Sequence, residues 1–225
     1  RRCRIVGDYM RYLTFALAKG RLAKTAMKMF EDIGIECEEM KDEKTRKLIF
    51  VNEELKLKFI IAKTADVPTY VEHGAADIGV IGKDVLMEAQ KDVYELLDLG
   101  FGRCHLMMAV PKDKKRAKLT DYTHTRVATK FPNVAKQFFT SKGMQMEYIK
   151  MNGSIELGPI VGLSESIVDI VETGTTLREN NLDEIAFIAK ASARLIANRA
   201  SFKLKFDRIS KLVKALEMEL EGANE

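Results

Sequence analysis

The sequence predicts an α/β protein of two lobes, each a mostly parallel sheet flanked by helices. Three observations carry this prediction. Short apolar runs alternate with segments of helical periodicity, and glycines stand at the ends of these runs. The alternation begins again after a glycine-rich segment near residue 102, which links the two halves of the chain. The length of 225 residues and the 46% hydrophobic content suit one large or two small domains with real cores. We therefore place lobe I at residues 10–101 plus 185–225 and lobe II at residues 102–184.

The first lobe begins with a strand and a helix. Residues 13–17 (LTFAL) form a short apolar run typical of a strand. The next segment has the i, i+3, i+4, i+7 spacing of a core-facing helix, at Ala26, Met29, Phe30 and Ile33. Residues 1–9 are basic and lack the apolar region of a secretory signal. Because the strand pattern starts just after Met10, we treat residues 1–9 as an extension outside the fold.

The rest of lobe I continues the alternation. Residues 47–51 and 57–62 predict strands on either side of a turn, and residues 76–82 predict another buried strand. Pro68 marks a helix start between them, because proline is favoured in the first turn of a helix. In parallel sheets of this kind, ligands bind outside the carboxyl ends of the strands.

The second lobe repeats the pattern. We expect a helix at residues 132–142 and a short helix start at 153–159, with strands at residues 104–110, 126–129, 147–151 and 167–171. A last strand, at residues 184–189, returns the chain towards lobe I. The C-terminal segment 205–220 carries an apolar stripe and predicts a packing helix, with an oligomer contact as the alternative.

The stretch 169–176 (DIVETGTT) has the layout of an anion cradle. A buried strand leads into a Thr/Gly loop and then a helix start, whose N–H groups and hydroxyls suit a phosphate. Asp169 and Glu172 would repel a phosphate, so they are better explained as acceptors for sugar hydroxyls or as outer ligands of a divalent ion. Phosphate plus diol suggests a ribose 5-phosphate. The alternative is an ordinary Thr-Gly turn at the end of a strand.

A second candidate anion-binding turn is Lys19-Gly20-Arg21. It follows the first strand and opens a helix, so two cations flank a glycine that permits close approach of an anion. The alternative is that both cations are simply solvated.

The composition argues against several functional classes. Charged residues interrupt every apolar run well before the roughly 20 residues that a membrane span needs. A net charge of +4, from 37 basic and 33 acidic residues spread along the chain, is too mild to indicate nucleic acid. Cys3, Cys37 and Cys104 lack metal-ligand spacing, and their odd number fits free thiols in a reducing cytosol better than a disulfide framework or a zinc site. We therefore expect a cytoplasmic protein without a resident metal.

Taken together, these segments resemble the short-form ATP phosphoribosyltransferases, from about Met10 to about Phe206. Five motifs in order carry the resemblance: residues 18–22 (AKGRL), 65–79 (ADVPTYVEHGAADIG), 128–134 (ATKFPNV), 153–159 (GSIELGP) and 169–176 (DIVETGTT). The resemblance implies a fold like that of type II periplasmic binding proteins, with the active site between two lobes.

The resemblance also implies a reaction and its partners. The reaction joins ATP and 5-phosphoribosyl 1-diphosphate into phosphoribosyl-ATP and diphosphate, with Mg²⁺ carried by the substrate phosphates, as the first step of histidine biosynthesis. Long forms carry an extra C-terminal regulatory domain, whereas short forms assemble with a catalytically inactive relative of histidyl-tRNA synthetase. A homodimer within such a hetero-oligomer is therefore expected.

Residue roles follow from the same resemblance. The sugar 5-phosphate is expected on Thr173, Gly174, Thr175 and Thr176. Asp169 and Glu172 match acidic positions that accept ribose hydroxyls, and Glu156 matches a further acidic contact to this substrate. Basic positions near the diphosphate and triphosphate groups are matched by Lys19, Arg21 and Arg46, and a pocket position by Cys104.

Two departures from the family pattern bear on these roles. Position 175 is Thr where many members have Arg or another residue, and the two acids are spaced D-x-x-E, unlike the adjacent pair of the commoner phosphoribosyltransferase fold. The chemistry is displacement at the anomeric carbon by an adenine nitrogen, which needs alignment and charge neutralisation more than a general base. Arg21 and Arg46 suit the neutralisation of departing diphosphate, because guanidinium binds phosphate oxygens in a bidentate manner. The rival functions are a binding module of the same fold without catalysis, a phosphoribosyl transfer to another base, and a purely structural subunit.

Overall fold

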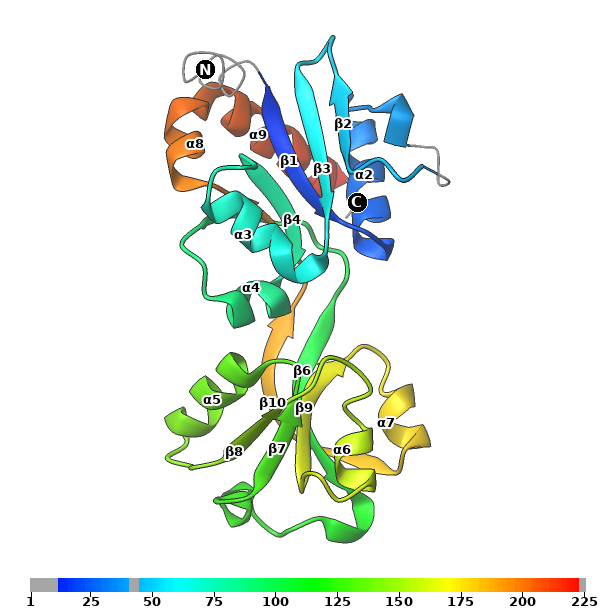
Figure 1. Cartoon of the computed structure of the whole chain (residues 1–225), viewed down its shortest axis with the longest axis vertical. Helices are drawn as coiled ribbons and strands as arrows, with labels where there is room; N and C mark the ends of the chain where they lie inside the picture. The colour runs from blue at the N-terminus through cyan, green and yellow to red at the C-terminus, as the bar shows by residue number, and fades with distance from the viewer. Residues whose placement is uncertain (1–11, 41–44, 223–225) are drawn as a thin grey trace. The chain divides into compact units, whose positions relative to one another are not determined.

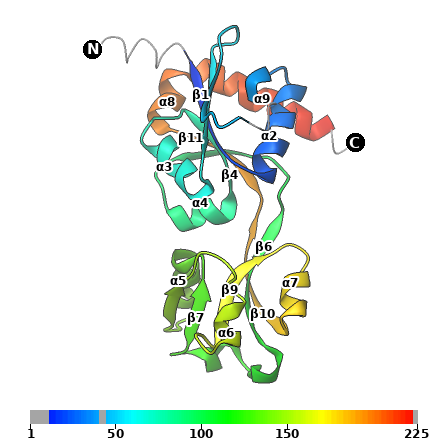
Figure 2. The same cartoon turned by 45° about the vertical axis from the view of Figure 1, so that its right-hand side comes forward.

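The computed structural model describes residues 12–40 and 45–222, which form two compact units (Figure 1, Figure 2). The first unit holds the described residues up to Gly102 and from Ser192 onwards, and the second unit is Arg103–Ala191. The boundary expected between residues 184 and 185 falls inside strand β10 (Leu182–Ala191), because β10 pairs along its length with β6 (Cys104–Pro111) of the second unit. The expected extension, residues 1–9, lies outside the described residues.

The first unit is built on a six-stranded sheet. The strands are β1 (Leu13–Ala18), β2 (Ile49–Asn52), β3 (Leu57–Ala62), β4 (Ile78–Gly82), β5 (Tyr94–Asp98) and β11 (Ala193–Ala197). Their spatial order is β2-β3-β1-β4-β11-β5. The inner strands β3, β1 and β4 run parallel, whereas β2, β11 and β5 are paired antiparallel to their neighbours.

Strand alternation divides the core of this unit between the two faces of the sheet. Phe15 and Leu17 of β1 pack with α2 (Arg21–Asp32) and α9 (Phe206–Gly222), whereas Ala16 and Ala18 belong to the cluster that includes α3 (Val67–Glu72) and α4 (Lys83–Ala89). A further helix, α8 (Arg199–Leu204), precedes α9. The stripe expected on α2 is confirmed at its centre, since Ala26 and Phe30 are fully buried.

A buried ion pair between Lys205, just before α9, and Asp77, just before β4, links α9 to this sheet. Lys205 donates from Nζ to Asp77 Oδ2 at 2.7 Å and to the carbonyl oxygen of Tyr12 at 2.7 Å. Burial lowers the pKa of Lys205, and its bond to Asp77 opposes that shift. Removing either partner would leave an uncompensated buried charge, so this pair specifies where α9 joins β1 and β4.

The second unit has a five-stranded sheet in the order β10-β6-β9-β7-β8. It contains β7 (Arg126–Thr129), β8 (Glu147–Lys150) and β9 (Ser166–Val171), with helices α5 (Pro132–Ser141), α6 (Leu157–Ile160) and α7 (Thr175–Glu179). Strands β8, β7 and β9 are parallel, and β6 joins β9 to β10 by antiparallel pairing. The strand β9 therefore lies at the centre of the sheet and positions the loop that follows it.

These units confirm the α/β class and the two lobes, with sheets that are mixed and not mostly parallel. The antiparallel strands β5 and β11 were not expected. Residues 94–98 (YELLD) lack a regular alternation, and β11 follows β10 after Ser192 alone, so no turn signal separates the two strands. Within the described part of the chain, no helix is long and apolar enough to cross a membrane.

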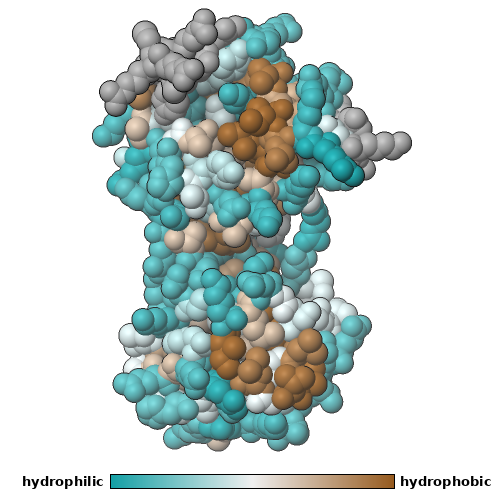
Figure 3. Space-filling model, viewed as in Figure 1, coloured by the Kyte–Doolittle hydropathy of each residue, from teal (hydrophilic) through white to brown (hydrophobic). Residues whose placement is uncertain are grey.

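Most large apolar side chains are buried, but some gather on the surface (Figure 3). In the second unit Leu157, Ile160 and Val161 of the α6 region are 50%, 54% and 69% exposed. An exposed apolar cluster of this kind marks a contact surface more often than an isolated apolar residue does.

Candidate active site

A cavity of about 430 Å³ lies in the second unit, at the end of β9. Seven of the expected site residues line it: Glu156, Asp169, Glu172, Thr173, Gly174, Thr175 and Thr176. Ile170, Val171 and Leu177 complete the wall. The structure therefore brings together two motifs, residues 153–159 and 169–176, that the chain separates.

The alternation of β9 explains why Asp169 reaches this cavity. Residues two apart on a strand share a face, so Asp169 lies on the same side as Ile167 and Val171. Those two pack in one cluster with Ile155, which precedes α6, and with Leu177 of α7, which lines the cavity. Glu156 is the residue just before α6, and this placement brings its carboxylate to the same cavity.

Gly174 is favoured by its backbone angles, and a side chain there would press on the ends of two neighbouring side chains. It precedes α7 in the left-handed conformation, with φ 71°. A Cβ atom there would lie 3.0 Å from Nη1 of Arg178 and 3.3 Å from Oε1 of Glu184. An l-amino acid with a side chain would therefore be strained and would displace its neighbours.

Three hydroxyl groups and an arginine surround the loop. Thr173 Oγ1 and Thr175 Oγ1 are 3.1 Å apart, and Arg178 donates from Nη2 to Thr175 Oγ1 at 3.1 Å. Thr173, Thr175 and Thr176 are all exposed, so their hydroxyls are open to a ligand. The first turn of α7 adds backbone N–H groups, which makes this end of the cavity attractive to an anion.

Arg178 was not among the expected site residues. It lies three positions after Thr175, on the same side of the short helix, and this i, i+3 spacing was the signal available in the sequence. Its guanidinium adds positive charge beside the hydroxyls. The cavity is thus lined by hydroxyl donors and by the carboxylates of Asp169, Glu172 and Glu156, a set of groups that suits a ligand with a phosphate and neighbouring hydroxyls.

The carboxylates of this cavity do not form a metal site by themselves. Among the residues described, no group of three or more His, Cys, Asp or Glu side chains is arranged to hold a metal ion.

The other candidate corner lies in the first unit. Strand β1 ends at Ala18, and Gly20 precedes α2 with φ 119°. A Cβ atom on Gly20 would have no atom within 4 Å, so this glycine is needed for its backbone angles and not for space. Lys19 and Arg21 are both exposed on either side of it.

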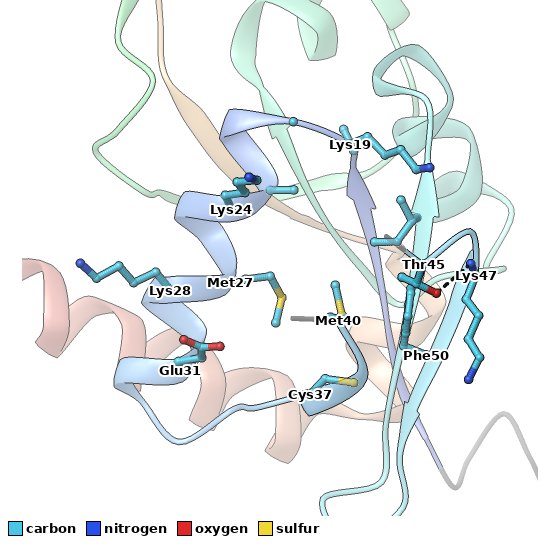
Figure 4. Close-up of a pocket in the computed structure, with 14 residues that line it drawn as sticks. Lys19, Lys24, Met27, Lys28, Glu31, Cys37, Met40, Thr45, Lys47 and Phe50 are labelled. Carbon is cyan, nitrogen blue, oxygen red and sulfur yellow. Dashed lines mark hydrogen bonds between the residues drawn. The ribbon is translucent and has the colours of Figure 1, made fainter. Parts of the chain in front are cut away.

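Lys19 and Gly20 also line a larger cavity, of about 740 Å³, between α2 and the strands β2 and β3 (Figure 4). Arg46 is exposed and lies between two of its lining residues, Thr45 and Lys47. Neither Arg21 nor Arg46 is part of the wall of either cavity. Cys104 also lines neither cavity: it is a buried cysteine at the start of β6, paired in register with Ala191 of β10.

Comparisons with known proteins agree on one family. A model of the ATP phosphoribosyltransferase family matches residues 63–218. The ATP phosphoribosyltransferase of Lachnospira eligens is 54% identical over 213 residues, which cover 94% of this chain and 98% of that protein. These relatives are enzymes, so the alternative of a binding module without catalysis is not favoured.

Solved structures extend the comparison to the fold. A chain of the ATP phosphoribosyl transferase (HisG:HisZ) complex from Thermotoga maritima superposes with a TM-score of 0.80 at 32% identity, covering 93% of this chain and 99% of that one. A substrate binding protein of an amino acid ABC transporter gives a TM-score of 0.57 at 12% identity and covers 93% of this chain. The second likeness concerns the fold alone and supports the expected relation to binding-protein folds.

Proposed function

Because the chain belongs to the ATP phosphoribosyltransferase family, the enzymes of the first step of histidine biosynthesis, we propose that its β9 cavity binds the sugar phosphate of the donor substrate. The donor is 5-phosphoribosyl 1-diphosphate, whose phosphoribosyl group is transferred to the adenine ring of ATP. The observation that carries this proposal is the meeting of three carboxylates with a Thr/Gly loop in one cavity of about 430 Å³.

The 5-phosphate is held by the loop and the first turn of α7. Thr173, Thr175 and Thr176 donate from their hydroxyls, and Gly174 allows the backbone to approach the phosphate closely. Arg178 supports Thr175 through its 3.1 Å hydrogen bond and adds charge. Each contact is charge-assisted, because the acceptor is an anion.

The ribose hydroxyls are accepted by Asp169 and Glu172, with Glu156 as a further acidic contact. Carboxylates cannot donate when ionised, so they suit the hydroxyl end of the donor and are unsuited to its phosphate end. Two fixed acceptors also orient the ring, which aligns the anomeric carbon for attack.

The leaving diphosphate is neutralised by cations of the first unit. We assign Arg21 and Arg46 to this task, together with Mg²⁺ that the substrate brings, and Lys19 to the phosphate groups of the substrates. Cys104 is assigned to the wall around the substrates. As diphosphate departs, charge builds up on its oxygens, and guanidinium groups that meet this charge stabilise the transition state.

We further propose that the chain works in the cytoplasm within a hetero-oligomer, as a homodimer bound to a regulatory subunit related to histidyl-tRNA synthetase. Three observations support this. The solved relative at 32% identity was studied as a HisG:HisZ complex, Cys37 is a buried free thiol, and the α6 region exposes an apolar cluster of the kind found at contact surfaces.

The test is an assay of diphosphate release with ATP and phosphoribosyl diphosphate, run with and without the regulatory subunit. Activity that needs both substrates and rises with the subunit supports the proposal. A panel of other bases and nucleotides as acceptors serves as the control. Release of diphosphate with another acceptor but not with ATP would contradict it.

A further inference from the structure

A strongly basic loop follows strand β6 in the second unit. Residues 112–118 (KDKKRAK) hold five cations and one carboxylate, so this loop alone has a net charge of +4. The whole chain of 225 residues also has a net charge of +4, so the charges outside the loop balance one another. All seven loop residues are exposed. The excess positive charge of the protein is therefore concentrated in one short surface segment.

The loop is anchored on a buried tyrosine. The backbone N–H of Arg116 donates to Tyr122 Oη at 2.7 Å, and this hydroxyl donates to the carbonyl oxygen of Lys114 at 3.5 Å. The guanidinium carbon of Arg116 lies 5.0 Å from the centroid of the Tyr122 ring, and Tyr122 is 2% exposed. A loop that is ordered in this way loses less conformational entropy when it binds a partner.

The loop lies away from the proposed donor site. Strand β6 is antiparallel to β9, with Ala109 opposite Ile167 and His105 opposite Val171, so the end of β6 lies beside the beginning of β9. The β9 cavity is at the other end of β9. Residues 112–118, all of which the structure describes, line neither cavity. The positive charge of the loop therefore has no role in the substrate contacts assigned above.

We propose that the loop 112–118 is a docking site for an acidic segment of the regulatory subunit. The inference rests on the proposed function, which places the chain in a complex with that subunit. Charge complementarity identifies this occupant, because a concentrated positive charge attracts and steers carboxylates over a Debye length of about 8 Å at physiological salt. Lys115 already holds Asp183 at 3.3 Å, with side chains 51% and 35% exposed. A pair this exposed is weak, so a carboxylate of the partner can replace it.

A nucleic acid is the less favoured polyanion. Proteins that bind single strands combine positive charge with aromatic side chains on which the bases stack. The ring under this loop belongs to Tyr122, which is buried and has Arg116 over it, so it offers no face to a base. The charges outside the loop balance one another and add no net attraction along a polymer.

The test measures association of the full chain with the regulatory subunit. The double variant Lys114→Glu, Lys115→Glu reverses two charges in the loop, and we expect the association rate constant to fall about tenfold at low salt, because exposed interface charges act mainly on association. The matched control is Lys136→Glu, Lys142→Glu, which makes the same change in net charge at exposed positions on and after α5 of the same unit. Thermal unfolding checks that both variants fold.

Salt dependence and a conservative variant sharpen the test. In about 0.5 M NaCl the difference between wild type and the loop variant should shrink to about twofold or less, because the Debye length falls to a few ångströms. Lys114→Arg, Lys115→Arg keeps both charges and should bind the subunit as wild type does. Diphosphate release without the subunit should be equal in all these proteins, since the loop lies away from the β9 cavity.

Three results would overturn the inference. Equal association rates for wild type and the loop variant, or equal losses in the loop variant and the control, would show that the loop is not the docking site. Unchanged subunit binding with lost binding of polyuridylate would assign the loop to nucleic acid instead. A wild-type chain that does not bind the subunit would contradict the proposed hetero-oligomer as well, so that failure is distinguishable from a failure of the loop alone.

Discussion

The two cavities follow the same local plan, yet they differ in what surrounds the glycine. In each, a strand ends near a glycine of positive φ that precedes a helix, Gly20 before α2 and Gly174 before α7. A Cβ atom on Gly174 would lie 3.0 Å from Arg178 Nη1 and 3.3 Å from Glu184 Oε1, whereas Gly20 faces open space. The β9 cavity is about 430 Å³ and has acidic and hydroxyl walls, and the α2 cavity is about 740 Å³ and has apolar walls with lysines around it. The same turn therefore borders a smaller polar cavity in one unit and a larger, mostly apolar cavity in the other.

The largest expected effect is on kcat, and it comes from the two arginines of the first unit. Arg21→Ala or Arg46→Ala removes a guanidinium assigned to the leaving diphosphate, so each should lower kcat by about a hundredfold, or about 3 kcal/mol of transition-state stabilisation. The measurement is diphosphate release at saturating substrates with the regulatory subunit present. Lys211→Ala, which removes a cation from the exposed side of α9, is the control. Wild-type turnover in both arginine variants would end this assignment.

The next effect concerns the proposed donor site of the second unit alone. Asp169→Ala or Glu172→Ala removes an acceptor for a ribose hydroxyl, and we expect donor binding to weaken by about tenfold to a hundredfold, because hydrogen bonds to a charged group contribute about 1.5–3 kcal/mol. ATP binding should change little. Isothermal titration with each substrate measures both affinities, and Glu179→Gln on the exposed side of α7 is the control. Equal losses for the two substrates would mean that the donor site has been misplaced.

A smaller effect tests the two glycines against each other. Both Gly20→Ala and Gly174→Ala force an l-residue into a positive φ, which costs about 1 kcal/mol by itself. Gly174→Ala also pushes against Arg178, so it should weaken donor binding by about tenfold more than Gly20→Ala does. Donor titration and thermal unfolding of both variants make the comparison. If the two variants lost donor affinity equally, crowding at Gly174 would not matter.

The loop after β9 could be predicted from the sequence, whereas the cavity beside α2 could not. The β9 loop could be predicted because its donors, acids and glycine are contiguous in residues 169–176, and only Glu156 had to be brought in from the family pattern. Arg178 was not predicted because it lies beyond the motif, and its hydrogen bond to Thr175 appears only in the folded loop.

The α2 cavity could not be predicted from local pattern. Its walls come from α2, from residues 37–40 and from β2 and β3, and these meet only in the folded unit. Met27, Cys37 and Phe50 are also residue types that sequence patterns assign to a core, so nothing local distinguishes a cavity wall from packed interior. The strands β5 and β11 were not predicted for a related reason, because they pair with each other although they lie far apart along the chain.

The smallest effect contrasts the ion pairs of the two units. In the first unit the Lys205–Asp77 pair is almost fully buried, whereas in the second unit the Arg126–Glu165 pair is about one-third exposed. The side-chain hydrogen bond from Arg126 lowers the pKa of Glu165 from 4.5 to about 2. A carboxyl group with a lowered folded-state pKa stabilises the fold fully above its unfolded pKa, near 4.5, and loses that contribution as the pH falls through about 2.

We therefore expect Glu165→Gln to lower the free energy of unfolding by about 1 kcal/mol at pH 6, because solvent screens a pair this exposed. The difference between wild type and Glu165→Gln should shrink at pH 3.5, where the unfolded chain already protonates Glu165. Urea unfolding of both proteins at the two pH values gives the result, with Glu179→Gln as a control in the same unit. A difference that stayed constant between pH 6 and pH 3.5 would show that hydrogen-bond geometry, and not charge, is what Glu165 contributes to joining β7 and β9.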